Sequence, residues 1–133
     1  MALYPQNEED TPTILIVDED ASVRHSLRFS LAVEGFAVRT YRTAGELLSA
    51  AGVPKRGCLI VDYNLSDMTG LDLVARLRTR AVPLPVILIT TNPTGIVRRR
   101  AEQAGVPLIE KPLLGDSLIN GIQAALVRAA SYP

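Results

Sequence analysis

Three short runs of purely apolar residues constrain the fold of this chain more than any other feature. They are Ile14-Leu15-Ile16-Val17, Leu59-Ile60-Val61 and Val86-Ile87-Leu88-Ile89, and all are rich in β-branched side chains. Strands buried on both faces have this composition, and such strands belong to parallel sheets that helices cover on both sides. Phe36 to Tyr41 alternates with polar residues, which suits an edge strand, and Leu108-Ile109 predicts a very short fifth strand.

Helical patterns lie between the expected strands. Val23, Leu27 and Leu31 are four residues apart and follow Asp20, a good N-cap, while Gly35 stands where this helix should end. Apolar spacing and capping signals, including possible capping boxes at both Thr-x-x-acid sites, mark four more helices near residues 43–51, 69–77, 94–104 and 118–126. Five strand–helix units predict an α/β fold with one open, doubly wound parallel sheet.

The composition limits the class of protein. The chain has 133 residues, which fits one domain, and 14 basic residues balance 14 acidic ones. A chain without net charge lacks the positive field of non-specific nucleic-acid binding, so we expect no direct nucleic-acid partner. No apolar run approaches the ~20 residues that span a bilayer, and the start does not resemble a signal peptide. We therefore expect no membrane association and a cytoplasmic location. The polar, acidic start with Pro5 and Pro12 predicts a flexible tail over 1–12, followed by one domain over 13–131.

Reactive polar residues follow the apolar strands. The acidic run Asp18-Glu19-Asp20 follows the first strand, Asp62 the third, and Thr90 the fourth, and Lys111 comes shortly after the fifth. Because the carboxyl ends of parallel strands share one edge of a sheet, we expect these side chains to converge on one cleft.

The expected cleft concentrates negative charge. Two carboxylates ~4 Å apart repel by ~1 kcal/mol in water and by several times more nearer the interior, so they must protonate or recruit a cation. Carboxylate oxygens with open positions suit Mg²⁺, which readily accepts phosphate oxygens as further ligands. Lys111 supplies a positive charge for a phosphoryl oxygen, Thr90 supplies a hydroxyl donor, and Asp62 is the natural nucleophile for an aspartyl phosphate.

Five motifs together resemble the receiver domains of bacterial response regulators, and their local sequences are most similar to the FixJ-like branch. They are Val17-Asp18-Glu19-Asp20, Val61-Asp62, Leu65-x-x-Met68-Thr69-Gly70, Ile89-Thr90 and Glu110-Lys111-Pro112. The resemblance covers Thr13 to about Ala130 and implies a flavodoxin-like (βα)5 sheet in the order 2-1-3-4-5. The general rule about ligands at the carboxyl ends of such sheets was drawn partly from this family, so it is not independent support.

The resemblance also implies a role for each site residue. Asp62 is expected to accept a phosphoryl group from a sensor histidine kinase or phosphotransfer protein. Glu19, Asp62 and the backbone carbonyl of Asn64 are the expected Mg²⁺ ligands, with Asp18 acting through water. The resemblance implies that such a domain is not an enzyme in the usual sense, because it only promotes its own phosphorylation and dephosphorylation.

Thr90 and Lys111 are implied to hold the phosphoryl group after transfer. The resemblance also implies a cis peptide bond before Pro112. The signal is then expected to leave through the face built by the fourth helix, the fifth strand and the fifth helix, toward a downstream protein or into a homodimer.

Four residues depart from the family pattern. Glu19 stands where aspartate is usual, and its extra methylene is expected to shift the position of the metal ion or to weaken its binding. Ser66 replaces a proline, which predicts a less rigid loop, and Thr91 replaces a small residue and is expected to shield Asp62. Leu108 occupies the position of a switching tyrosine or phenylalanine, so the output step is expected to differ.

Two other functions fit parts of the pattern. In a haloacid-dehalogenase-like phosphatase, Asp18 would be the nucleophile and Asp20 the acid/base, with Thr90 and Lys111 in fitting order. That family's closing acidic pair is missing, because Asp116 is the only acid after Lys111. A degenerate receiver, which binds partners without phosphorylation, is the third hypothesis.

Three features have simple structural interpretations. His25 fits a surface position on the first helix better than a phosphohistidine. Cys58 is the only cysteine, so no internal disulfide can form, and its place in an apolar strand predicts a buried side chain. The run Arg98-Arg99-Arg100 predicts a solvated helix face, with a partner contact as the alternative.

Overall fold

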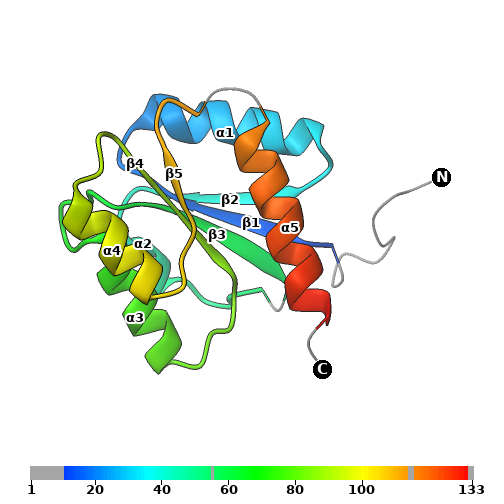
Figure 1. Ribbon diagram of the computed structural model, residues 1–133. Helices are drawn as coiled ribbons and strands as arrows, with labels where there is room; N and C mark the ends of the chain where they lie inside the picture. The colour runs from blue at the N-terminus through cyan, green and yellow to red at the C-terminus, as the bar shows by residue number, and fades with distance from the viewer. Residues whose placement is uncertain (1–10, 55, 114–115, 132–133) are drawn as a thin grey trace.

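The computed structural model describes residues 11–54, 56–113 and 116–131 (Figure 1). The expected flexible tail over 1–12 therefore falls almost wholly outside the described residues. Within the described part of the chain, no helix has the length and apolar character needed to cross a membrane.

One five-stranded sheet forms the centre of the molecule, in the order β2-β1-β3-β4-β5, and every neighbouring pair is parallel. The strands are β1 (Thr13–Val17), β2 (Ala37–Tyr41), β3 (Gly57–Asp62), β4 (Val86–Thr90) and β5 (Leu108–Glu110). The apolar runs form the inner strands β1, β3 and β4, whereas the more polar β2 and the short β5 form the edges. The predicted α/β fold, flavodoxin-like order and edge positions are confirmed.

Five helices cover the two faces of the sheet (Figure 1). They are α1 (Ala21–Val33), α2 (Ala44–Ser49), α3 (Gly70–Thr79), α4 (Gly95–Gln103) and α5 (Ser117–Ser131). Successive strand residues point to opposite faces. Ile14, Ile16 and Ile60 therefore pack with α1 and α5, while Leu15 and Leu59 pack with α2, α3 and α4. This two-sided burial explains why the inner strands are continuously apolar.

The ends of α1 follow the sequence signals. The carboxylate of Asp20 accepts hydrogen bonds from the backbone N–H groups of Ser22 and Val23, which satisfies two donors that have no partner inside the helix. The chain leaves the helix through Gly35, whose φ of 95° is a conformation that side chains with a Cβ rarely adopt. Asp20 thus has the structural role of an N-cap.

The two expected capping boxes differ in detail. At α3 both reciprocal bonds between Thr69 and Asp72 are present. At α2 the Thr43 hydroxyl accepts from the Glu46 N–H, but the Glu46 carboxylate accepts from the N–H of Arg42, one residue earlier than the pattern predicts. The helix start is predicted correctly, although its second bond is displaced.

Cys58 is buried in β3, as its apolar surroundings predicted. Burial raises the pKa of its thiol to about 12, because the charged thiolate cannot be solvated there. The thiol therefore stays protonated at neutral pH.

Candidate functional site

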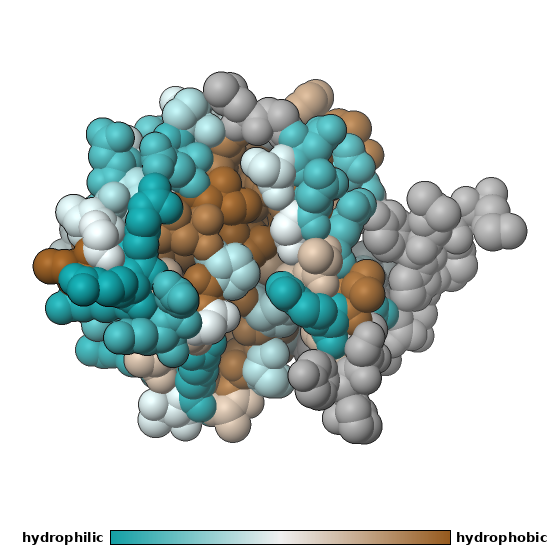
Figure 2. All heavy atoms as spheres, in the orientation of Figure 1, coloured by the Kyte–Doolittle hydropathy of each residue, from teal (hydrophilic) through white to brown (hydrophobic). Residues whose placement is uncertain are grey.

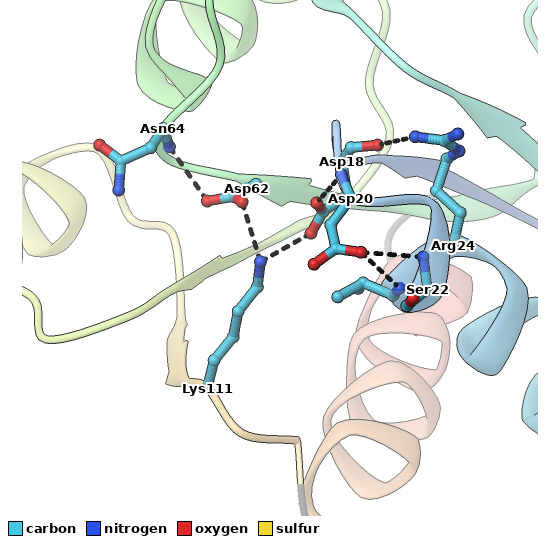
Figure 3. Close-up of polar contacts among 8 residues, drawn as sticks. Asp18, Asp20, Ser22, Arg24, Asp62, Asn64 and Lys111 are labelled. Atoms are coloured by element: carbon cyan, nitrogen blue, oxygen red, sulfur yellow. Dashed lines mark hydrogen bonds and ion pairs between the residues drawn. The ribbon is translucent and has the colours of Figure 1, made fainter.

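Three charged side chains converge at the carboxyl ends of the strands (Figure 3). The Lys111 ammonium group lies between two carboxylates, with Nζ 2.8 Å from Asp18 Oδ2 and 2.9 Å from Asp62 Oδ2. Lys111 is 93 residues from Asp18 and 49 from Asp62 in sequence. The predicted convergence of these three residues is confirmed.

Strand register explains this convergence. Val17 of β1 is paired with Val61 of β3, so Asp18, directly after β1, and Asp62, the last residue of β3, lie at the same level. The chain after β5 is held by the bond from the Lys111 N–H to the Thr90 carbonyl oxygen, at 2.7 Å. The peptide bond between Lys111 and Pro112 is cis, as the resemblance implied.

The site is largely closed to solvent. The side chain of Asp18 is 1% exposed, that of Asp62 13% and that of Lys111 16%. Burial raises the pKa of Asp18, although the hydrogen bonds from Lys111 and from the Asp20 N–H oppose this change. Burial lowers the pKa of Lys111, but its hydrogen bonds to the two aspartates and their charges outweigh that effect, so this pKa is raised overall. Lys111 is therefore a protonated cation.

Backbone donors fix the second oxygen of each aspartate. Asp18 Oδ1 accepts from the Asp20 N–H at 2.9 Å, and Asp62 Oδ1 accepts from the Asn64 N–H at 3.0 Å. Arg24 also donates to the Asp18 carbonyl oxygen, at 2.7 Å. Each carboxylate thus bonds to the main chain through one oxygen and to Lys111 through the other, which fixes its orientation (Figure 3).

The loop after β3 turns back tightly beside Asp62. Asn64 and Thr69 form an isolated antiparallel bridge, and the Gly70 N–H donates to the Tyr63 carbonyl oxygen at 2.9 Å. A Cβ on Gly70 would lie 2.6 Å from the Asp62 carbonyl oxygen, so only glycine fits there. This close approach brings the backbone of Asn64 next to the Asp62 carboxylate.

Glu19 makes a different contact from the other predicted metal ligands. Its Oε2 accepts a hydrogen bond from the Ser66 hydroxyl, in the loop after β3. Residues 19 and 66 are 47 apart in sequence, and no periodic pattern connects them, so sequence reasoning did not find this pair. Ser66 was predicted only to loosen the loop, whereas its hydroxyl links that loop to the loop after β1.

The donor atoms around the cleft suit a hard divalent cation. Asp18, Glu19 and Asp62 offer carboxylate oxygens, and Asn64 offers a backbone carbonyl, which are the ligand types that Mg²⁺ prefers. Among the described residues, no three His, Cys, Asp or Glu side chains already form a group that could hold a metal ion. The residues thus fit Mg²⁺ by chemistry, while Glu19 lies with Ser66 and the two aspartates with Lys111.

The two threonines after β4 differ in exposure. Thr90 is 2% exposed, whereas Thr91 is exposed to solvent. In the part of the chain that is described, the Thr90 hydroxyl makes no hydrogen bond to Asp62 or Lys111. Thr90 therefore lies at the predicted strand end but is not joined to the ion pairs.

The face formed by α4, β5 and α5 carries the remaining predicted output features. Figure 2 shows apolar surface gathered along β5, between α4 and α5, with hydrophilic residues around it. Arg98 Nη2 lies 2.9 Å from Glu110 Oε1, an ion pair that sequence reasoning missed when it assigned the arginine run to solvent. Leu108 is partly buried in β5.

On α1, His25 is exposed, as predicted.

Comparison with known proteins is consistent with this architecture. The family model of the response regulator receiver domain matches residues 14–123. The transcriptional regulatory protein FixJ of Rhizobium meliloti strain 1021 is 35% identical over 114 residues, which is 85% of this chain and 56% of that protein. FixJ of Azorhizobium caulinodans is 33% identical over 117 residues, 86% of this chain and 55% of that protein. The chain spans about half the length of the curated relatives that it matches.

Solved structures give the same result. The crystal structure of FixJ-N is 33% identical, has a TM-score of 0.79, and is matched over 87% of this chain and 94% of that one. Full-length FixJ from B. japonicum is 30% identical, with a TM-score of 0.81 over 90% of this chain and 59% of that one. Because the family model covers most of the chain and the predicted fold is present, the chain belongs to the response regulator receiver family of two-component systems, in its FixJ-like branch.

Proposed function

We propose that Asp62 accepts a phosphoryl group from a histidine kinase or phosphotransfer protein. The observation that carries this proposal is the placement of Lys111 between Asp62 and Asp18 in a site that is largely closed to solvent. A carboxylate held beside a buried cation is suited to nucleophilic attack on phosphorus, because the cation offsets charge that would otherwise repel the incoming phosphoryl oxygens.

The transfer requires one bond to form and one to break. An Asp62 carboxylate oxygen bonds to phosphorus while the bond from phosphorus to the donor breaks, and the donor leaves with that bond's electron pair. Lys111 offsets the charge on the phosphoryl oxygens, and the Asn64 N–H orients the nucleophile through Asp62 Oδ1. Thr90, at the adjacent strand end, supplies a hydroxyl donor once the phosphoryl group has arrived.

The carboxylates of Asp18, Glu19 and Asp62 and the Asn64 carbonyl would hold Mg²⁺, which supplies further positive charge to the phosphoryl oxygens. Asp18 would participate through water, as the resemblance to the receiver family implies. The domain acts as a phosphoacceptor signalling module in the cytoplasm, not as a turnover enzyme.

The output surface is the face of α4, β5 and α5, where half-buried apolar residues line the edge strand (Figure 2). Phosphorylation shifts an existing equilibrium toward the state that a downstream protein, or a second copy of the chain, recognises there. Leu108 has no aromatic ring to reorient, so this shift proceeds without such a change. No direct contact with nucleic acid is part of this proposal.

The test is labelling with a small phosphodonor in the presence of Mg²⁺, followed by intact mass measurement. We expect one phosphoryl group on the wild-type protein, none on Asp62→Asn, and wild-type labelling on Asp116→Asn, which removes an exposed carboxylate outside the cleft. Equal labelling of Asp62→Asn would contradict the assignment. A wild-type protein that neither binds Mg²⁺ nor becomes labelled would instead support the degenerate receiver.

The phosphatase hypothesis is less well supported by the site. Its acid/base, Asp20, is the N-cap of α1 and accepts hydrogen bonds from Ser22 and Val23. Phosphatase turnover that is lost in Asp18→Asn and kept in Asp62→Asn would reverse this ranking.

A further inference from the structure

The Ser66–Glu19 hydrogen bond joins two residues that both depart from the family pattern. Glu19 follows β1, Ser66 follows β3, and the serine hydroxyl donates to Glu19 Oε2. A proline at position 66, the residue usual in the family, has no side-chain donor and cannot make this bond. The two departures are therefore parts of one local arrangement.

The bond limits the freedom that the longer side chain introduces. Glutamate has one more rotatable bond than aspartate, so its carboxylate samples more positions and loses more entropy when a ligand fixes it. The Ser66 bond engages Oε2, while Oε1 accepts no hydrogen bond from the described residues. One oxygen is thus held by the protein, and the other remains available to a cation.

We propose that Ser66 is a positioning residue for Glu19, and that its hydroxyl raises Mg²⁺ affinity by holding the glutamate carboxylate in one orientation. This inference rests on the proposed function, since it assumes that the cleft binds Mg²⁺. Partners that orient a metal ligand through a hydrogen bond commonly change metal affinity by ~10-fold or more when they are removed.

The same loop offers a matched control. Asp67, next to Ser66, accepts a hydrogen bond from the Gly45 N–H at 2.8 Å, which ties the loop to the start of α2 without involving Glu19. Asp67→Asn weakens a tether of this loop at a different point. Any general loosening of the loop should therefore appear in Asp67→Asn, whereas an effect on Glu19 itself should not.

The experiment is a double-mutant cycle in which the dissociation constant of Mg²⁺ is measured by titration calorimetry. We expect Ser66→Ala to weaken Mg²⁺ binding by ~10-fold, and Ser66→Thr, which keeps the hydroxyl, to stay within about twofold of wild type. In a Glu19→Asp background, the side chain is one methylene shorter, so we expect the bond to residue 66 to be lost. Ser66→Ala should then change the affinity by less than about twofold, and Asp67→Asn should act equally in both backgrounds.

The outcomes separate this inference from the function beneath it. Unchanged affinity in Ser66→Ala, or an equal loss in the wild-type and Glu19→Asp backgrounds, overturns the positioning role even if Asp62 is still phosphorylated. Failure of the wild-type protein to bind Mg²⁺ overturns the metal part of the proposed function and this inference with it. Far-ultraviolet circular dichroism on every variant verifies that the measured protein is folded.

Discussion

Glu110 and Lys111 are neighbours in sequence, and each belongs to an ion pair of nearly the same length. Glu110 pairs with Arg98 at 2.9 Å, with side chains 49% and 55% exposed. Lys111 pairs with Asp18 and Asp62 at 2.8 and 2.9 Å, with side chains that are 16% exposed or less. One peptide unit therefore separates an ion pair in solvent from an ion pair in the interior.

The difference shows that bond length alone does not determine what an ion pair contributes. Water and salt screen the exposed pair, and either partner can be solvated again if the other is lost. In the buried cluster, loss of the Lys111 cation leaves two carboxylates that water cannot reach, which is costly. The variants below measure this contrast directly, all by urea unfolding without divalent cations.

Lys111→Met should have the largest effect. Methionine keeps most of the side-chain length but removes the cation between Asp18 and Asp62, so we expect a loss of about 3 kcal/mol in the free energy of unfolding at pH 7. The loss should shrink toward pH 4, because the raised pKa of Asp18 favours protonation of that carboxyl as the pH falls. If the free energy of unfolding fell no further in Lys111→Met than in Arg98→Ala, the proposed difference between the buried and the exposed ion pairs would be contradicted.

Asp18→Asn should stabilise the protein, by about 1 kcal/mol at pH 7. The pKa of Asp18 is raised in the folded state, so its protonated form favours folding at low pH and this contribution is lost as pH rises through the native pKa. Asparagine stays neutral throughout. The difference between variant and wild type should accordingly be small at pH 4 and grow toward pH 7, and the opposite trend would show that Lys111 outweighs burial.

Arg98→Ala should cost less than about 0.5 kcal/mol, since its pair with Glu110 is half exposed. The small loss should decrease further at high salt, whereas the loss in Lys111→Met should change little. Arg99→Ala, at the next position of α4 and also exposed, is the control for helix propensity. A salt-independent loss above about 1 kcal/mol would place Arg98 among the buried interactions.

Cys58 gives an independent and smaller readout of the same contrast. Its thiol is buried and has a pKa of about 12, so a thiol reagent at pH 8 should react only when the fold opens. Labelling should be faster in Lys111→Met than in wild type and unchanged in Arg98→Ala. Fast labelling of the wild-type protein would show that β3 opens locally, without global unfolding.

Much of the site was predictable, because the carboxyl ends of parallel strands lie at the same edge of a sheet. Assigning the three apolar runs to parallel strands predicts that Asp18 and Asp62 lie at one edge of the sheet. The order 2-1-3-4-5, which the resemblance implied, then places them at the ends of neighbouring strands, as observed. Lys111 follows from the short fifth strand in the same way. The helix starts at Asp20 and Thr69 were also predictable, because capping is local in sequence.

The remaining contacts depend on side chains that no periodic pattern connects. Ser66 reaches Glu19 between two loops, and Arg98 reaches Glu110 from a helix to an edge strand. In both cases the residue types were noticed, but their directions depend on loop and helix placement in three dimensions. At the start of α2, Glu46 accepts from the Arg42 N–H, one residue before the N–H that a capping box uses.

The bonding capacity of the Lys111 ammonium group has one more consequence. An ammonium nitrogen carries three N–H donors, and within the described residues two of them are used, one by each aspartate. A third acceptor can thus be added to the cluster without breaking either existing bond. The ammonium group can therefore donate to an additional oxygen while it keeps its hydrogen bonds to both carboxylates.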